Sequence, residues 1–387
     1  VTAMTNNRHI MLAAGGTGGH IFPAIAVAEA LISRGYTVSL ITDARGMDLG
    51  SVMPEVAVHR ISASGIGGGF VAKAKAVLSI GIGVAQACRL FRRFRPRCIV
   101  GFGGYPSVPT MLAAIIRSLP TVIHEQNAVL GRANHLVAGR VSMIATSFAE
   151  TEGVSPENAV KVVMTGNPVR QPFTEIRNRP YPPVGPNGEG IKILILGGSL
   201  GAKIFSDVVP RAIADMPEAL RRRFAIVQQC RAEDLDRVRE TYDSVGISPE
   251  LATFFDDVPD RMAAAHIVIT RAGASTIAEL AEMGRPAILV PYPHALDDHQ
   301  TANAKSIDDH EAGWLMPQDG FTPESLTIRL EGFVNLTNTL TNAAKAAKSL
   351  GGRNAAEAVA DQVERLSGTR PNGGAGPASD RVREIAA

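Results

Sequence analysis

The chain has 387 residues, of which 45% are hydrophobic and 20% charged, a composition typical of a globular protein with two or three domains. Its formal net charge of +2 does not indicate a nucleic-acid partner, and we expect none. The first residues lack the apolar core of a secretory signal, and no uninterrupted apolar run reaches the roughly 18 residues of a membrane span. The cysteines are scattered and the acidic residues lack ligand spacing, so we expect a cytosolic protein without disulfides or a bound metal.

The first half of the chain alternates apolar strands with helical segments. Strands are predicted at residues 10–16, 37–43, 98–104 and 121–126. Helices are predicted at residues 23–33, 70–97, 107–117 and 131–139. Strands that alternate with helices of 10 to 15 residues are typical of βαβ units, so the first half is predicted to form a parallel sheet.

A linker separates this half from a second one that repeats its beginning. Residues 177–190 contain four prolines and three glycines, a composition typical of a linker. The next segment repeats the opening order of an aliphatic strand, a Gly-Gly-Ser/Thr-x-Gly turn and a helix. Further strands are predicted at 223–230, 252–258, 266–273 and 285–293, and two late helices at 326–350 and 354–366. The pattern predicts an α/β protein with two doubly wound domains.

The two glycine-rich turns are candidate phosphate sites. Neither has the dinucleotide fingerprint G-x-G-x-x-G, because the sixth position counted from Gly16 is Ile21, and neither continues as a P-loop. Asp43 is the one feature that would suit the ribose of a dehydrogenase cofactor. A tight strand-to-helix turn alone could explain one such loop. Two matching loops that face each other across a cleft favour a nucleotide-bearing donor and a second substrate, because backbone amides and helix N-termini bind anions.

Two polar clusters in the first half are candidates for chemistry. His20 begins the first helix beside the glycine turn, and an imidazole can accept a proton near neutral pH. It could equally be an N-terminal helix residue without a chemical role. His124, Glu125, Gln126 and Asn127 follow a buried-type strand, and such strand ends line ligand clefts, although a structural cluster is the alternative.

A third candidate site follows the strand at 266–270. Thr276 and Glu279 have the spacing of a capping box, which alone could explain both residues. Alternatively, the helix N-terminus binds a phosphate and Glu279 accepts ribose hydroxyls. Gln300 and Asn303 offer amides for sugar hydroxyls, or form a polar loop and helix start.

Six motifs spread over residues 8–366 resemble the MurG family of bacterial glycosyltransferases. They are "GGTGGHIFPAIAVAEAL", "GFGGYPSVP", "IHEQNAVLGRANH", "GNPVR", "ILGGSLGA" and "RAGASTIAELAEMGRPAILVPYP" with "DDHQTANA". The resemblance implies a GT-B fold, in which two Rossmann-like domains face a central cleft. It implies transfer of N-acetylglucosamine (GlcNAc) from UDP-GlcNAc to the C4 hydroxyl of lipid I, which gives lipid II, with inversion at the anomeric carbon and no cofactor or metal.

The resemblance also implies roles for individual residues. His20 is the expected base for the acceptor hydroxyl, with Glu125 in reserve. The expected substrate-binding residues are Thr17, Gly18, Gly19, Asn127, Arg170, Ser199, Phe255, Ala274, Ser275, Thr276, Glu279 and Gln300. In the second glycine turn, Leu200 replaces the glutamine common in the family. The segment before Gln300 is one residue longer than in some relatives, so His299 could share its sugar contact.

The implied organisation is an acceptor domain at residues 1–170 and a UDP-GlcNAc-binding domain at 171–353. Helix 354–366 is expected to pack back on the first domain, and 367–387 to be a disordered tail. Two alternatives remain at this point. A UDP-GlcNAc epimerase would share the domain plan and act on UDP-GlcNAc alone, and a non-catalytic nucleotide-sugar binding protein would show no turnover.

The charge distribution of the first half indicates a membrane partner. No Asp or Glu occurs between Glu55 and Glu125, where nine basic residues are found: Arg60, Lys73, Lys75, Arg89, Arg92, Arg93, Arg95, Arg97 and Arg117. The helix in 70–97 has a predicted buried stripe of Ala74, Val77, Leu78, Ala85, Cys88 and Phe91, with Ile80, Ile82 and Val84 outside it. An ordinary core helix with a basic end is one explanation. We prefer a patch that binds anionic lipid, which places the protein peripherally on the cytoplasmic face of the cell membrane.

Overall fold

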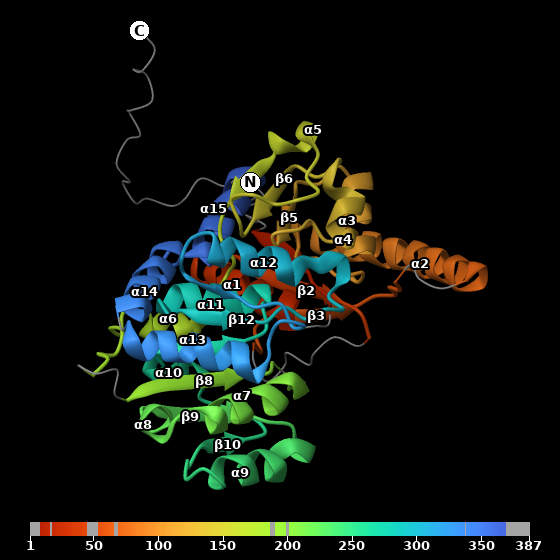
Figure 1. The fold of residues 1–387 in the computed structure, drawn as a ribbon. Coiled ribbons are helices and arrows are strands. Elements are labelled where there is room, and N and C mark those ends of the chain that lie inside the picture. Colours follow the sequence, from red (N-terminus) through yellow and green to blue (C-terminus); the bar gives the residue numbers. More distant parts are fainter. Residues whose placement is uncertain are drawn as a thin grey trace, which may run out of the picture.

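The computed structural model describes residues 8–15, 18–44, 53–65, 69–185, 190–198, 201–336 and 338–368. Thr17, Ser199, Leu200 and nearly all of the predicted tail therefore lie outside the described residues. The described chain forms two parallel sheets with helices on their faces, as the alternation of strands and helices predicts (Figure 1).

The first sheet has the strand order β3-β2-β1-β4-β5-β6-β7. Its strands are β1 (His9–Ala13), β2 (Thr37–Thr42), β3 (Ala57–Arg60), β4 (Cys98–Gly101), β5 (Thr121–Glu125), β6 (Met143–Thr146) and β7 (Val162–Met164). The helices are α1 (Gly18–Ser33), α2 (Phe70–Phe94), α3 (Ser107–Ile116), α4 (Arg132–Ala138) and α5 (Pro156–Ala159). The strand order reverses between β1 and β4, and ligands of doubly wound sheets bind at the carboxyl ends of the strands at such a reversal.

The second sheet has the order β10-β9-β8-β11-β12-β13 and reverses between β8 and β11. Its strands are β8 (Ile191–Leu196), β9 (Phe224–Gln229), β10 (Glu250–Ala252), β11 (Ile267–Thr270), β12 (Ala287–Leu289) and β13 (Gly313–Leu315). Its helices are α6 (Gln171–Ile176), α7 (Lys203–Asp215), α8 (Glu218–Arg221), α9 (Leu235–Asp243), α10 (Val258–Ala264), α11 (Ala274–Met283), α12 (His299–Asp308), α13 (Pro323–Asn335) and α14 (Asn338–Leu350). Short 3-10 turns occupy Ala232–Asp234 and Leu296–Asp298.

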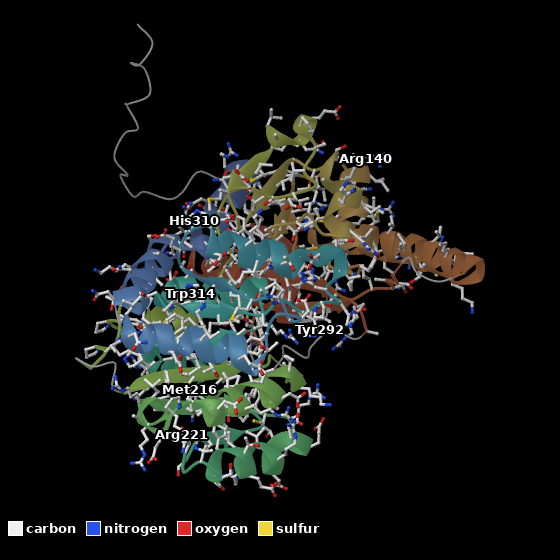
Figure 2. The ribbon with its side chains drawn as sticks, viewed as in Figure 1. Arg140, Met216, Arg221, Tyr292, His310 and Trp314 are labelled. Carbon is white, nitrogen blue, oxygen red and sulfur yellow. The ribbon has the colours of Figure 1, made fainter. Side chains whose placement is uncertain are left out.

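Two predicted elements of the second half are wrong in extent. The strand predicted at 252–258 is only the end of β10, followed by a loop before α10. The helix predicted at 326–350 is two helices, α13 and α14, because Leu336 leaves the helical conformation and the two pack on different partners, α7 and α11. Trp314 of β13, labelled in Figure 2, lies against α13 with its ring centroid 4.6 Å from that of Phe333.

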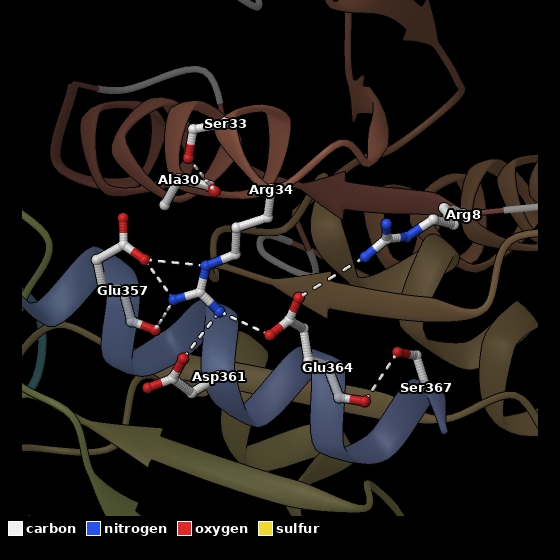
Figure 3. Close-up of polar contacts among 8 residues, drawn as sticks. All are labelled: Arg8, Ala30, Ser33, Arg34, Glu357, Asp361, Glu364 and Ser367. Carbon is white, nitrogen blue, oxygen red and sulfur yellow. Dashed lines mark hydrogen bonds and ion pairs between the residues drawn. The ribbon is translucent and has the colours of Figure 1, made fainter. Parts of the chain in front are cut away.

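The last described helix, α15 (Ala355–Ser367), packs on the first domain. Val359, Ala360 and Val363 are buried in one cluster with Ile10 and Leu12 of β1. At the surface of this contact, Arg34 pairs with Glu357, with Asp361 at 2.8 Å and with Glu364 at 2.9 Å (Figure 3). The chain thus crosses to the second domain near residue 170 and returns near residue 354.

Helix α2 extends away from the rest of the first domain (Figure 1). The predicted buried stripe is wrong in most positions: Ala74 and Ala85 are exposed, as are Val77 (63%) and Leu78 (66%). The helix packs on α3 through small residues instead, since a Cβ atom at Gly83 would lie 2.9 Å from Cβ of Pro109. Among the described helices, α2 is the one long and apolar enough for a membrane span by composition, but its C-terminal half belongs to this packed domain.

Candidate active site

A cleft of about 2000 Å³ lies between the carboxyl edges of the two sheets. Every predicted site residue that the structure describes lines it: Gly18, Gly19, His20, Glu125, Asn127, Arg170, Phe255, Ala274, Ser275, Thr276, Glu279 and Gln300. A second cavity of about 780 Å³, between α1, α11, α12 and the segment 350–357, contacts only Ala274 of this set. The loops after β1, β5 and β11 therefore meet at one site, as expected for two doubly wound sheets.

His20 sits in the first turn of α1, in a cradle of glycines. A Cβ atom added to Gly15, Gly103 or Gly104 would lie 3.2 to 3.3 Å from atoms of the imidazole. Gly103 and Gly104 also have φ angles of 85° and 72°, which favour glycine. The loop of Gly103 and Gly104 after β4 was not predicted to belong to the site, although two adjacent glycines directly after a buried strand were a usable signal.

His124 lies behind the cleft and is fully buried. Its Nε2 atom donates a hydrogen bond to the carbonyl oxygen of Gly166 at 3.0 Å. Burial lowers the pKa of His124 to about 4, because the imidazolium would lose its hydration in the core. The side chain is therefore neutral at physiological pH.

This burial predicts a loss of stability in mild acid. Since the pKa of His124 is about 4 in the folded protein and about 6.5 in an unfolded chain, the unfolded state binds more protons between these values. The stabilisation is complete above pH 6.5 and is lost as pH falls toward 4. We expect the free energy of unfolding to fall by about 2 kcal/mol more between pH 7 and 5 in the native protein than in a His124→Gln variant. Urea titrations followed by circular dichroism measure the difference, and equal pH dependence in both proteins would contradict it.

Glu125 is a buried carboxylate that fixes the loop after β5. Its Oε1 atom accepts hydrogen bonds from the backbone N–H and side-chain amide of Asn127, at 3.1 and 3.2 Å. Its Oε2 atom accepts from the backbone N–H of Gly131 at 2.9 Å and from the amide of Asn134 at 2.8 Å. Four donors occupy both oxygens, so this arrangement suits a structural anchor better than the reserve base that the resemblance implies.

Asn303 connects the domains instead of contacting sugar. Its side chain is fully buried: Oδ1 accepts from the backbone N–H of Ala128 at 2.7 Å, and Nδ2 donates to Oδ1 of Asn127 at 3.1 Å and to the carbonyl of Ala272. The expectation that Asn303 offers its amide to a substrate is therefore wrong, because every one of these atoms already has a protein partner. Asn127 lines the cleft and is oriented by both Glu125 and Asn303.

The N-terminus of α11 faces the cleft. The helix begins at Ala274 with Gly273 as its N-cap residue, and no side chain caps it. The alternative explanation of Thr276 and Glu279 as a capping box is therefore excluded, because Thr276 already lies inside the first turn. The hydroxyl oxygen of Ser275 is buried and has no partner among the described residues. An uncapped helix N-terminus with such a hydroxyl suits an anionic group.

Glu279 is buried beside Arg170. The Nε and Nη2 atoms of Arg170 both donate to Oε1 of Glu279, at 3.0 and 2.7 Å. Burial raises the pKa of Glu279, and the guanidinium opposes this shift. The same guanidinium lies over the rings of Phe22 and Phe173, at 4.7 and 5.0 Å from their centroids. Arg170 therefore joins α1 of the first domain to α6 and α11.

The residues expected to contact the sugar and the base line the second domain's wall of the cleft. Oε1 of Gln300 accepts a hydrogen bond from the backbone N–H of Tyr292 (labelled in Figure 2) at 2.9 Å, which leaves its NH₂ group for a ligand. The ring of Phe255 is only 5% exposed and lies under Arg261, whereas the neighbouring Phe254 is 66% exposed. Of these two adjacent phenylalanines, Phe254 is thus the accessible one, and it was not predicted as a site residue.

Comparisons with known proteins agree with this geometry. Residues 10–146 match the glycosyltransferase family 28 N-terminal domain, and residues 192–365 match the glycosyltransferase family 28 C-terminal domain. The "UDP-N-acetylglucosamine--N-acetylmuramyl-(pentapeptide) pyrophosphoryl-undecaprenol N-acetylglucosamine transferase" of Paramagnetospirillum magneticum is 53% identical, over 92% of this chain and 96% of that protein.

Solved structures point the same way. The crystal structure of Acinetobacter baumannii MurG is 30% identical and superposes with a TM-score of 0.76, over 92% of this chain and 99% of that one. A UDP-GlcNAc 2-epimerase from Neisseria meningitidis superposes with a TM-score of 0.65, over 92% of this chain and 100% of that one, but at 13% identity it shares only the fold. The predicted family and GT-B fold are confirmed: this chain belongs to the MurG family of glycosyltransferases.

Proposed function

We propose that this protein transfers GlcNAc from UDP-GlcNAc to the C4 hydroxyl of the N-acetylmuramic acid in lipid I, forming lipid II, with inversion at the anomeric carbon. The observation that carries the proposal is the cleft itself, which is lined both by an imidazole of the first domain and by the uncapped N-terminus of α11 of the second. That pairing supplies a proton acceptor for one substrate and an anion site for the other.

The donor is proposed to bind on the second domain. The N-terminus of α11, with Ser275 and Thr276, holds a phosphate, and Gln300 contacts the GlcNAc ring. Glu279 accepts hydrogen bonds from the ribose hydroxyls through its Oε2 atom, because Arg170 donates to Oε1. Arg170, which lines the cleft beside this carboxylate, contacts the diphosphate.

The transfer step uses charges that the cleft already provides. His20 removes the proton of the acceptor hydroxyl as the oxygen attacks the anomeric carbon on the face opposite UDP. The amides of Gly18 and Gly19 at the start of α1, the start of α11 and Arg170 stabilise the charge that grows on the departing diphosphate. Because these groups can neutralise the leaving group, we propose that the reaction proceeds without a bound metal or cofactor.

One assay separates this function from its alternatives. UDP release is measured from UDP-GlcNAc, with EDTA, in the presence and absence of a short-chain lipid I analogue. Release that depends on the analogue is the expected result. Conversion of UDP-GlcNAc without an acceptor would indicate an epimerase, and binding of UDP-GlcNAc without any turnover would indicate a binding protein. Activity that appears only when divalent metal replaces EDTA would overturn the metal-free mechanism.

We also propose that α2 docks the protein on the cytoplasmic face of the cell membrane. Val77, Leu78 and Ile82 are 63%, 66% and 46% exposed on the part of α2 that extends from the domain. Exposed basic side chains flank them at both ends of the helix: Lys73, Lys75, Arg89, Arg92 and Arg93. Apolar side chains that insert between head groups, with cations around them, are what an interfacial helix uses to bind anionic lipid. We propose no nucleic-acid partner.

Reversal of charge on α2 is expected to weaken vesicle binding. Each basic residue near an anionic surface contributes about 1 kcal/mol, so the triple Arg89, Arg92 and Arg93→Glu variant should bind phosphatidylglycerol-containing vesicles at least about 100-fold more weakly. Its turnover of a water-soluble acceptor analogue should be unchanged. A matched control reverses three exposed charges of the second domain, Arg211, Arg239 and Lys345. Equal flotation of both variants with vesicles would contradict docking through α2.

A further inference from the structure

A continuous chain of hydrogen bonds runs behind His20. The Nδ1 atom of His20 lies 3.1 Å from Oε1 of Gln126. Nε2 of Gln126 lies 3.1 Å from Nδ1 of His124, and Nε2 of His124 lies 3.0 Å from the carbonyl oxygen of Gly166. Gln126 and His124 are 2% and 0% exposed, so solvent does not compete for these bonds.

The direction of the chain follows from two backbone carbonyls, which can only accept hydrogen bonds. Nε2 of Gln126 also lies 3.1 Å from the carbonyl oxygen of His124, so the NH₂ group of the amide must face that oxygen. Rotation of the amide by 180° would place two oxygens against each other. The carbonyl of Gly166 likewise requires the proton of His124 on Nε2, which leaves Nδ1 of His124 to accept the second N–H of Gln126.

The orientation of the Gln126 amide also determines which nitrogen of His20 carries a proton. Because Oε1 of Gln126 can only accept, the His20 nitrogen that faces it must carry a proton. In the neutral imidazole the other nitrogen, Nε2, is then unprotonated. Nε2 has no hydrogen-bond partner among the described residues, and His20 lines the cleft.

We propose that Gln126, oriented by His124, holds His20 in the Nδ1–H tautomer and so leaves Nε2 as the proton acceptor toward the substrate. The inference rests on the proposed role of His20 as base. Gln126 and His124 are positioning residues in this arrangement, since they act only through His20. The neutrality of His124, whose pKa burial lowers to about 4, keeps the chain of donors intact in the physiological range.

The tautomer matters because the Nε2–H form of His20 would direct its only N–H toward the substrate. It would also place the lone pair of Nδ1 against the oxygen of Gln126. In serine proteases, a partner that enforces the wrong tautomer lowers kcat by about 10⁴-fold. Loss of Gln126 removes the preference without enforcing the wrong form, so the expected effect here is smaller.

The direct test is the ¹⁵N NMR spectrum of protein labelled in its histidines, because protonated and bare ring nitrogens resonate far apart. His20 is assigned from the signals that disappear in His20→Ala. We expect Nδ1 of His20 and Nε2 of His124 to carry the protons, and the other nitrogen of each ring to be bare. A proton on Nε2 of His20 in the native protein would overturn the proposal.

The functional test uses Gln126→Met, which keeps the side-chain length and removes all three side-chain hydrogen bonds of Gln126. We expect a mixture of His20 tautomers and a fall in kcat of about 10- to 100-fold, with KM for UDP-GlcNAc unchanged within about 3-fold. Gln228→Met is the matched control, because Gln228 is equally buried, accepts a bond from Tyr242 and donates to the carbonyl of Phe205, away from the cleft. Gln228→Met should lower the unfolding temperature as much as Gln126→Met does and leave kcat unchanged.

The results distinguish the proposal that His20 is the base from the proposal that Gln126 positions it. If Gln126→Met keeps both kcat and the Nδ1–H form while His20→Ala is inactive, His20 remains the base and the positioning role of Gln126 is wrong. If His20→Ala keeps normal turnover, the base has been assigned wrongly, whichever tautomer the spectrum shows. If both enzymatic effects occur with the expected spectrum, both proposals are supported.

Discussion

Replacement of His20 by alanine is expected to lower kcat by about 10²- to 10⁴-fold, the range that a positioned general base contributes. One ring nitrogen of His20 has no hydrogen-bond partner among the described residues and can accept a proton, whereas the nearby carboxylate of Glu125 already accepts four hydrogen bonds. Affinity for UDP-GlcNAc should change little, because the proposed donor contacts lie on the second domain. Steady-state kinetics with a lipid I analogue and calorimetric titration of UDP measure the two effects.

The matched control is His135→Ala, an exposed histidine on α4 that does not line the cleft. It should keep native kinetics. Near-normal turnover of the His20→Ala enzyme would transfer the role of base to Glu125 and would require the loop of residues 125–131 to release that carboxylate. A loss of UDP binding equal to the loss of kcat would instead indicate that His20 only supports the shape of the first glycine turn.

Replacement of Arg285 by methionine is expected to lower the free energy of unfolding of the second domain by at least about 3 kcal/mol. Arg285 is 1% exposed and has no carboxylate partner among the described residues. Its guanidinium donates instead to five backbone carbonyls, those of Pro180, Met262, Ala263, Met283 and Gly284. Burial lowers the pKa of Arg285 because the charged guanidinium loses its hydration. Removal of the side chain is costly for a different reason, since the five buried carbonyls would then have no donor.

For a domain of this size, the loss of about 3 kcal/mol expected for Arg285→Met corresponds to a fall in melting temperature of about 6–12 °C. The fluorescence of Trp314, the single tryptophan of the chain, reports on the second domain directly. Arg285→Lys should recover only part of the loss, because one ammonium group cannot reach carbonyls on three segments. Arg239→Met, at an exposed position of α9, is the control and should change stability by less than about 0.5 kcal/mol. A shift no larger than that in Arg285→Met would contradict the structural role.

The architecture was predictable because its strands are buried on both faces. β1 and β11 are predominantly apolar and buried throughout, and β8 is interrupted only by the exposed Lys192, so the sequence identifies all three as strands. The strands that were not predicted, β3, β6, β7 and β13, have three or four residues, and most lie toward sheet edges. Such strands bury few side chains, so their apolar pattern is too short to distinguish from that of a loop.

The face of α2 could not be predicted for a different reason. The predicted stripe included the exposed Ala74 and Ala85, whereas the buried small residues of the helix are Ala76, Gly83 and Ala87. Close packing of two elements depends on how near their backbones can come, which a small residue such as Gly83 permits beside Pro109. Hydrophobicity alone does not distinguish the buried alanines of this helix from the exposed ones, so the pattern did not identify the buried face.

The chain's local patterns were sufficient for the family, the two doubly wound domains and many of the residues that line the cleft, since each motif is contiguous and follows a strand. They were not sufficient to predict which distant residues pair with one another. The bond of Asn303 to Asn127, the pairing of Arg170 with Glu279 and the bond of Arg285 to the carbonyl of Pro180 join residues that are 176, 109 and 105 positions apart. Such contacts depend on where the folded backbone brings each polar group, because a buried donor must bond to whichever acceptor lies within about 3 Å of it.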